Sequence, residues 1–284
     1  MKKLPPRHLI AEQVRQALAE DIGTGDLTAT LVPDNDTTQA TLISREPAVV
    51  CGIAWVQEVF DQLDSDINID WLSHDGDDVI NEQAWCTIQG PSRGILTGER
   101  TALNFLQLLS GTATATKRMV DQLEGTGAQL LDTRKTVPGL RLAQKYAVCC
   151  GGGTNHRLGL YDGILVKENH IRAAGSVTKA VTAALTHSNG VSLIEVEVES
   201  VAELSQALTA GAQRLLLDNF SLAQLRRAVQ INAGQAQLEA SGNVTAKTIR
   251  EIALTGVNFV SSGTMTKNIH AIDLSLQFEE SPAN

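Results

Sequence analysis

The chain has 284 residues, of which 43% are apolar and 19% are charged, a profile typical of folded globular proteins rather than disordered ones. Its formal net charge of −9 argues against nucleic acid or an anionic membrane as a general partner, because both favour a basic surface. The start MKKLPPRHLI lacks the apolar core of a signal peptide, and no apolar run is long enough to span a membrane. Four cysteines are too few for a disulfide framework. We therefore expect a protein of the reducing cytoplasm.

The first part of the chain mixes helical and strand periodicities and predicts an α+β domain with a small sheet. Helices are expected at residues 8–19, 52–63 and 92–109, the last of them ended by Ser110-Gly111. Strands are expected at 67–71 and 82–89, and as a pair formed by 40–44 and 47–51. The alternating segment 271–279 is expected to return to this domain as an edge strand.

From residue 128 onward, short apolar strands alternate with amphipathic helices, which predicts a parallel sheet covered by helices. The strands are expected at 128–133, 163–169, 192–200, 214–220, 236–242 and 257–263. A complete eight-stranded barrel takes roughly 250 residues, so a reduced barrel of about six strands fits better. The predicted fold class is α/β: an N-terminal α+β open sandwich domain (1–110 with 271–284), followed by an incomplete parallel α/β barrel (111–270).

Basic residues gather between residues 132 and 172 in an otherwise acidic chain: Arg134, Lys135, Arg141, Lys145, Arg157, Lys167 and Arg172. Like charges held together cost energy unless an anion lies among them. The pattern therefore predicts a site for a small molecule with several negative charges. The neighbouring Cys149-Cys150 pair has no metal-ligand spacing, so free thiols are favoured over zinc.

Polar residues follow the carboxyl ends of the predicted parallel strands, which meet at the mouth where barrel enzymes place their chemistry. Glu195, Glu197 and Glu199 share one face of a strand, and basic partners or solvent are expected for one or two of them. Glu197 with Asp218 suggests ligation of Mg²⁺ or hydrogen bonds to sugar hydroxyls. Lys167 has two interpretations, a Schiff-base lysine or a charged phosphate ligand, and the second is favoured by its basic neighbours.

Two turns after the last strands have the chemistry of phosphate sites. Ser241-Gly242-Asn243 and Ser262-Gly263-Thr264 each place small residues where backbone N–H groups can face an anion. The alternative is ordinary turn chemistry, which Ser-Gly after a strand often provides. The loops after the last two strands of a barrel are its usual phosphate site, which favours the first interpretation.

Blocks along nearly the whole chain resemble the quinolinate phosphoribosyltransferase family, also called nicotinate-nucleotide pyrophosphorylase (carboxylating). They include EDIGTGDLT (20–28), GERTALNFLQLLSG (98–111), DTRKTVPGLR (132–141), GGGTNHRLGL (151–160), VKENHI (166–171), EVEVE (195–199), LLLDNF (215–220) and EASGNV (239–244). The resemblance implies an open sandwich followed by an incomplete α/β barrel, assembled as a homodimer with shared active sites. It also implies Mg²⁺-dependent transfer of phosphoribosyl from 5-phosphoribosyl-1-pyrophosphate to quinolinate, with decarboxylation to nicotinate mononucleotide in NAD biosynthesis.

The resemblance also assigns roles to residues. For quinolinate it implies Arg100 from the partner subunit, Arg134, His156 and Arg157. For phosphoribosyl pyrophosphate it implies Thr133, Lys135, Lys167, Glu197, Asp218, Ser241, Gly242, Asn243, Ser262, Gly263 and Thr264. Lys135, Lys167, Glu197 and Asp218 are the expected catalytic residues, and Glu197 and Asp218 would hold Mg²⁺ directly or through water.

Three alternatives are carried alongside this interpretation. The first is a paralogue of the same fold associated with molybdenum transport. The second is a barrel aldolase that forms a Schiff base on Lys167. The third is a regulatory barrel that binds phosphate without catalysis.

Overall fold

The computed structural model describes residues 3–187, 190–191 and 193–279. The chain forms two compact units, here called the sandwich unit (Met1–Lys117, Val137–Gly152 and Ile269–Asn284) and the barrel unit (Arg118–Thr136 and Gly153–Asn268). The division predicted from sequence placed 111–270 in one domain, whereas the segment Val137–Gly152 groups with the sandwich unit. No described helix is long and apolar enough to cross a membrane.

A four-stranded antiparallel sheet in the order β12-β1-β5-β3 forms one layer of the sandwich unit. Its strands are β1 (Thr37–Ser44), β3 (Asn68–Trp71), β5 (Ala84–Pro91) and β12 (Leu274–Phe278), and a separate pair is formed by β2 (Ala48–Val49) and β4 (Asp78–Val79). The last strand adds at the edge beside β1, which confirms the predicted return of 271–279 to this domain. The unit also contains α1 (Arg7–Ile22), η1 (Ala29–Leu31), α2 (Ile53–Leu63), most of α3 (Ser92–Asp121) and α4 (Arg141–Cys150).

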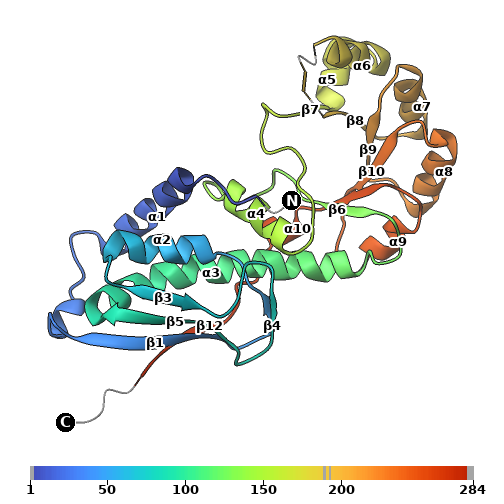
Figure 1. Cartoon of the computed structure of the whole chain (residues 1–284). Coiled ribbons are helices and arrows are strands. Elements are labelled where there is room, and N and C mark those ends of the chain that lie inside the picture. The colour runs from blue at the N-terminus through green and yellow to red at the C-terminus, as the bar shows by residue number, and fades with distance from the viewer. Residues whose placement is uncertain (1–2, 188–189, 192, 280–284) are drawn as a thin grey trace. The chain divides into compact units, whose positions relative to one another are not determined.

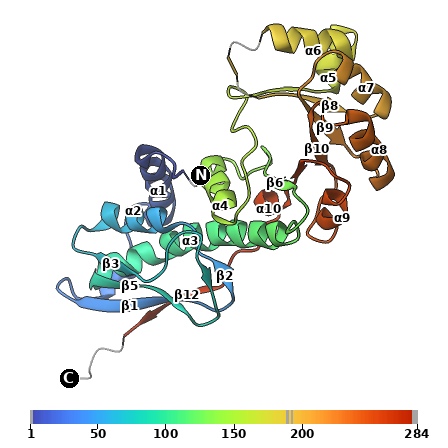
Figure 2. The same cartoon turned by 45° about the vertical axis from the view of Figure 1, so that its right-hand side comes forward.

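The core of the sandwich unit lies between these helices and the sheet, as Figures 1 and 2 show for α2 and α3. Trp55 and Phe60 of α2, Trp85 of β5 and Leu106 of α3 are completely buried there. Each such side chain contributes about 1.5–3 kcal/mol relative to an exposed one. The helical period of α2 places its large residues on one face, and that face closes the sheet.

The predicted pairing of 40–44 with 47–51 is wrong. Strand β1 is an interior strand whose two edges are occupied by β12 and β5, so no edge is left for the segment that follows it. The short β2 pairs instead with β4. Local alternation identified strand-forming segments here, but the partner of each strand is set by long-range packing.

Helix α3 continues through Ser110-Gly111 to Asp121, so the predicted helix end at 109 is also wrong. Gly111 serves close packing, because a Cβ there would collide with the backbone carbonyl oxygen of His270. The hydroxyl of Ser110 accepts from the backbone N–H of Cys51 and donates to its carbonyl oxygen. A Ser-Gly pair that signals a helix end in the sequence is used here for tertiary contact.

Six parallel strands form the barrel unit in the order β6-β11-β10-β9-β8-β7. They are β6 (Gln129–Leu131), β7 (Ile164–Val166), β8 (Ile194–Val198), β9 (Arg214–Asp218), β10 (Gln237–Ser241) and β11 (Phe259–Ser261). The edges β6 and β7 are not paired with each other among the described residues, so the barrel is open between them. This confirms the predicted incomplete six-stranded barrel.

Helices cover the outside of this sheet, with α6, α7 and α8 running along β7 to β10 (Figures 1 and 2). The helices are α5 (Glu168–Ala174), α6 (Val177–Thr186), α7 (Val201–Thr209), α8 (Leu222–Asn232), α9 (Ile249–Ala253) and α10 (Thr264–Lys267). Ser176, Ser200 and Ser221 cap α6, α7 and α8, each accepting a hydrogen bond from a backbone N–H in the first turn of its helix. Such caps contribute about 0.5–2 kcal/mol each. Those at Ser200 and Ser221 start α7 and α8 soon after β8 and β9 end.

Candidate active site

A cavity of about 650 Å³ lies at the carboxyl ends of the barrel strands. Every site residue that was predicted within the barrel lines it: Thr133, Arg134, Lys135, His156, Arg157, Lys167, Glu197, Asp218, Ser241, Gly242, Asn243, Ser262, Gly263 and Thr264. The segments that carry them are separated by up to about half of the chain, and the parallel sheet brings their ends together. Arg100, the remaining predicted residue, is exposed on α3 and does not line the cavity of its own chain.

The basic side of the cavity is formed by Arg134, Lys135 and Arg157. Burial lowers the pKa of Arg157, and the positive charge of Arg134 lowers it further. The Arg157 guanidinium also donates to the carbonyl oxygen of Gly163 at 3.2 Å. The two positively charged guanidinium groups repel each other, and an anion bound between them would relieve that repulsion.

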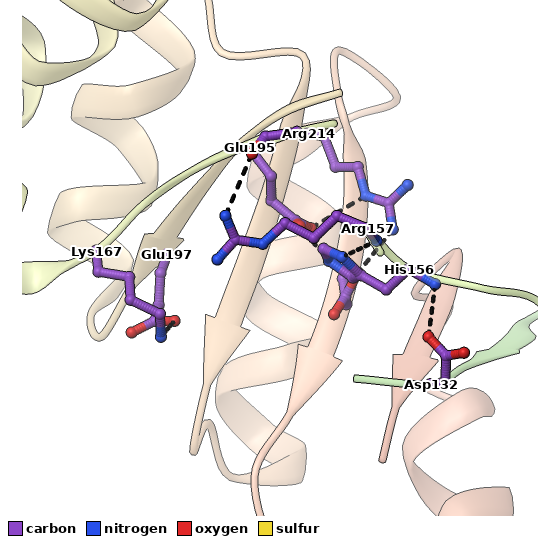
Figure 3. A network of polar contacts seen from close by, with 9 residues as sticks. Asp132, His156, Arg157, Lys167, Glu195, Glu197 and Arg214 are labelled. Carbon is purple, nitrogen blue, oxygen red and sulfur yellow. Dashed lines mark hydrogen bonds and ion pairs between the residues drawn. The ribbon is translucent and has the colours of Figure 1, made fainter. Parts of the chain in front are cut away.

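His156 lies next to Arg157 and points toward Glu195 and Arg214 (Figure 3). Its Nε2 is 2.7 Å from Oε2 of Glu195, and its backbone N–H donates to Asp132 at 2.8 Å. The side chain of His156 is only 7% exposed. The structure thus gives the ring a carboxylate partner from the protein, and the implied role of His156 toward a substrate carboxylate stays a prediction.

Glu195, Arg214 and Glu239 complete this set and were not predicted as site residues. Arg214 donates from Nε to Glu195 at 3.0 Å and from Nη2 to Glu239 at 2.8 Å, and its guanidinium lies 4.2 Å from the ring centroid of Phe259. This confirms the expectation that Glu195 has a basic partner. The sequence could have indicated Arg214 and Glu239 as well, because charged residues at alternate positions of neighbouring strands face the same side of a sheet.

The acidic side of the cavity is formed by Glu197 and Asp218, at the ends of the neighbouring strands β8 and β9. Lys167 donates from Nζ to Oε2 of Glu197 at 2.7 Å, and the lysine side chain is 46% exposed (Figure 3). Lys167 is therefore paired with a carboxylate and open to solvent, not enclosed in an apolar pocket. This geometry favours an anion ligand over a Schiff-base nucleophile.

The turn after β10 is built against the turn after β9. Gly242 has a φ of +106°, and a Cβ on it would collide with the side-chain oxygen of Asn219. Asn219 itself has a φ of 56° and donates from Nδ2 to Asp218 at 2.8 Å. Sequence reasoning did not select Asn219, although Asn is favoured where the backbone is left-handed. The two turns therefore fix the position of the Asp218 carboxylate together.

The turn after β11 is closed by hydroxyl groups. Ser262 donates to the carbonyl oxygen of Val244 at 3.0 Å, and its hydroxyl lies 2.7 Å from that of Thr264. A Cβ on Gly263 would lie 3.0–3.1 Å from Thr133 and Lys135, so the glycine allows the turn to approach the basic side. Lys267, at the end of α10, also lines the cavity and was not predicted.

The described residues include two groups whose ligand atoms are close enough to share a metal ion, His156 with Glu195 and Glu239, and Cys51 with Asp75 and Cys150. In the first, both glutamates are already paired with Arg214. In the second, the Asp75 carboxylate accepts from the backbone N–H of Gly52 and from the hydroxyl of Tyr146. Glu197 and Asp218 offer the hard oxygen donors that suit Mg²⁺, which usually takes one or two carboxylates together with substrate phosphates.

Comparison with known proteins identifies the family. Residues 26–110 match the model of the quinolinate phosphoribosyl transferase N-terminal domain, and residues 112–277 match that of the C-terminal domain. The chain is 38% identical to the probable nicotinate-nucleotide pyrophosphorylase (carboxylating) of Bacillus subtilis (strain 168), covering 90% of this chain and 89% of that protein. It is 37% identical to the chloroplastic nicotinate-nucleotide pyrophosphorylase (carboxylating) of Arabidopsis thaliana, covering 97% of this chain and 85% of that protein.

The solved structure of the nicotinate-nucleotide pyrophosphorylase of Francisella tularensis superposes with a TM-score of 0.94 at 50% identity, covering 98% of this chain and 99% of that one. A sandwich unit and an open six-stranded barrel, with charged groups lining a cavity at the carboxyl ends of its strands, define the class as a barrel enzyme. The chain belongs to the quinolinate phosphoribosyltransferase family.

Proposed function

We propose that this protein transfers the phosphoribosyl group of 5-phosphoribosyl-1-pyrophosphate to quinolinate, releasing pyrophosphate and CO₂ and leaving nicotinate mononucleotide for NAD biosynthesis. The observation that carries the proposal is the set of charged groups that line one cavity. Arginines and lysines suited to carboxylates and phosphates line it together with carboxylates suited to a sugar. Quinolinate brings two carboxylates, and the co-substrate brings a phosphate and a pyrophosphate.

The quinolinate carboxylates are assigned to Arg134 and Arg157, because a planar guanidinium pairs with a carboxylate through two parallel hydrogen bonds. Arg100 of the partner subunit would complete this set, so the proposal includes a homodimer with shared sites. Exposure of Arg100 on its own chain leaves it available for such a role.

The phosphates are assigned to the loops and to the lysines. The turns at Ser241–Asn243 and Ser262–Thr264 offer backbone N–H groups to the 5-phosphate. Lys135 and Lys167 would hold the pyrophosphate as point charges. Mg²⁺ held by Glu197 and Asp218 would supply charge neutralisation for the leaving pyrophosphate.

Loss of pyrophosphate leaves positive charge on the ribose ring, as in glycoside hydrolysis. The carboxylates of Glu197 and Asp218 lie on the side of the cavity where they could stabilise that charge, and the lysines would stabilise the departing anion. Attack by the quinolinate nitrogen then gives an alkylated ring, whose positive nitrogen stabilises the electron pair left on C2 when the C2–CO₂ bond breaks. A proton from solvent then restores the C2–H bond of the product. Most of the protein's contribution is therefore positioning and electrostatics.

The test mixes pure protein, Mg²⁺ and phosphoribosyl pyrophosphate with quinolinate labelled in its 2-carboxylate, and follows labelled CO₂ and nicotinate mononucleotide. The expected result is release of both in equal amounts, with strong loss in Lys135→Ala and none in the control Lys179→Ala on the exposed face of α6. Absence of labelled CO₂ from folded protein would overturn the proposal. Trapping of a sugar phosphate on Lys167 by borohydride would indicate the aldolase instead, and binding without turnover would indicate a paralogue or a regulatory barrel.

A further inference from the structure

Four side chains form a buried cluster beneath the cavity that the proposed reaction does not use directly: His156, Glu195, Arg214 and Glu239, called here the floor cluster. Its glutamates are at most 1% exposed, and Arg214 is 15% exposed. Figure 3 shows His156, Glu195 and Arg214 directed toward one another from the loop before β7 and from strands β8 and β9. Glu239 joins them from β10 and also lines the cavity.

The hydrogen bonds define the charge of His156. The backbone N–H of Arg157 donates to its Nδ1 at 2.7 Å, so Nδ1 is an unprotonated acceptor. The proton of the ring then belongs on Nε2, which donates to Glu195 at 2.7 Å. His156 is therefore a neutral imidazole in this arrangement.

With His156 neutral, the charge of the floor cluster depends on Glu239. Arg214 carries one positive charge, and the pKa of Glu195 is lowered below its usual value: burial opposes this, but the hydrogen bond from His156 and the positive charge of Arg214 outweigh it. These two charges cancel. An ionised Glu239 would leave one net negative charge in a buried place, directly under a cavity built for anions.

Three observations disfavour that negative charge. Burial raises the pKa of Glu239, and the charge of Glu195 raises it further. Oε2 of Glu239 accepts from Arg214, but its buried Oε1 has no hydrogen-bond partner of good geometry among the described residues. The hydroxyl of Ser261, on the adjacent strand β11, is also buried without one. As a donor this hydroxyl would lower the pKa of Glu239, whereas a protonated Oε1 can donate a hydrogen bond to it instead.

We infer that Glu239 carries a proton beneath the occupied site, and that this neutral acid keeps the floor of the cavity from opposing its anionic ligand. Glu239 does not touch the ligand in this proposal. Its protonation state sets the net charge beneath the cavity, and it acts through its contacts with Arg214 and His156. The charged and titratable groups that face it are His156, Glu195 and Arg214. The inference rests on the proposed function, because it takes the ligand of this cavity to be the dicarboxylate quinolinate.

The sign of the effect follows from linkage. Raising the pH above the pKa of Glu239 ionises it, so the anion binds more weakly, and binding at that pH draws a proton onto Glu239. A single charge near a dianion in a medium of intermediate dielectric weakens binding roughly tenfold. A Gln at position 239 keeps the acceptor for Arg214 and cannot ionise.

The test is isothermal calorimetry of quinolinate binding to the full-length protein from about pH 6 to about pH 9, a range that brackets histidine and raised carboxyl pKa values. Buffers of different ionisation enthalpy report the protons taken up, and both ligand carboxylates stay ionised throughout. We expect uptake to pass through a maximum of about half a proton per site between the pKa values of the free and bound protein, with affinity falling roughly tenfold across that range. Glu239→Gln should abolish both trends, and the matched control Glu251→Gln, an exposed residue of α9, should keep them.

Infrared difference spectra of the free protein provide a second measurement that does not depend on binding. A carboxylic acid band at about pH 6 that disappears at about pH 9 and is missing from Glu239→Gln supports the inference, and absence of this band from the wild-type protein at about pH 6 overturns it. Equal proton uptake in wild type and Glu239→Gln also overturns it. Failure of quinolinate to bind at any pH refutes the proposed function instead, and the infrared band then decides the inference alone.

Discussion

Gly242 offers a sharp test of how the loop after β10 supports the site. At its φ of +106° an alanine is strained, and the added Cβ would collide with Oδ1 of Asn219 and lie 2.8 Å from Cγ and 3.0 Å from Cα of the same residue. The side chain of Asn219 donates a hydrogen bond to Asp218. Asn219 cannot move away from the added Cβ without breaking a second hydrogen bond, because its backbone N–H donates to the carbonyl oxygen of Ser241 at 2.9 Å. Gly242→Ala should therefore move the carboxylate of Asp218 as well as the loop.

The expected cost has two parts. A non-glycine residue with a positive φ costs about 1–3 kcal/mol. Overpacking against Asn219 adds about 1–3 kcal/mol if the loop stays in place. If the loop moves instead, the strain is relieved at the expense of the geometry that the site needs, and a 1 Å displacement there reduces the rate by about 10²-fold.

The assay compares Gly242→Ala with Gly125→Ala by urea denaturation and by steady-state kinetics. Gly125 has a φ of +74° and no atom within 4 Å of a Cβ, so it reports the backbone cost without the collision. We expect both variants to lose stability, and only Gly242→Ala to lose a large part of kcat/KM for phosphoribosyl pyrophosphate. Equal kinetics for the two variants would refute the reasoning that the loop and Asn219 fix Asp218 together.

Three further predictions concern assembly and the buried charges. Inactive Arg100→Ala and Lys135→Ala proteins should recover part of their activity when mixed and allowed to exchange subunits; no recovery despite exchange, shown by mass spectrometry of tagged chains, would contradict a shared site. Arg214→Met should lower the free energy of unfolding by about 3–5 kcal/mol in chemical denaturation, because it leaves buried carboxylates without their cation. Tyr146→Phe should cost about 1 kcal/mol in the same measurement, since it removes the 2.8 Å hydrogen bond to Asp75; an unchanged midpoint would show that this bond contributes nothing net.

The arrangement of charge has a consequence for how the site works as a whole. Arg134 and Arg157 repel each other across the mouth, while the floor cluster is close to neutral when Glu239 is protonated. The attraction for anions is thus concentrated at the groups that would touch them.

The sequence by itself determined the order and type of most elements, the six-stranded barrel and nearly all of the cavity lining. Period-two strands, amphipathic helices and the turn residues after each strand are local features, and the carboxyl ends of parallel strands meet by geometry. Lys135, Asp218 and Gly242 could be selected for that reason before any contact was known. The resemblance to a family then divided these residues among ligands.

Only the tertiary structure decided which surfaces met. The partner of β1, the continuation of α3 past Gly111 and the opening between β6 and β7 depend on packing between segments far apart in the chain. The same holds for the floor cluster, in which Arg214 and Glu239 acquire their roles only when strands β8 to β10 lie side by side. Periodicity shows which face of a strand a residue occupies, but burial, partner and charge state are set by what is packed against that face.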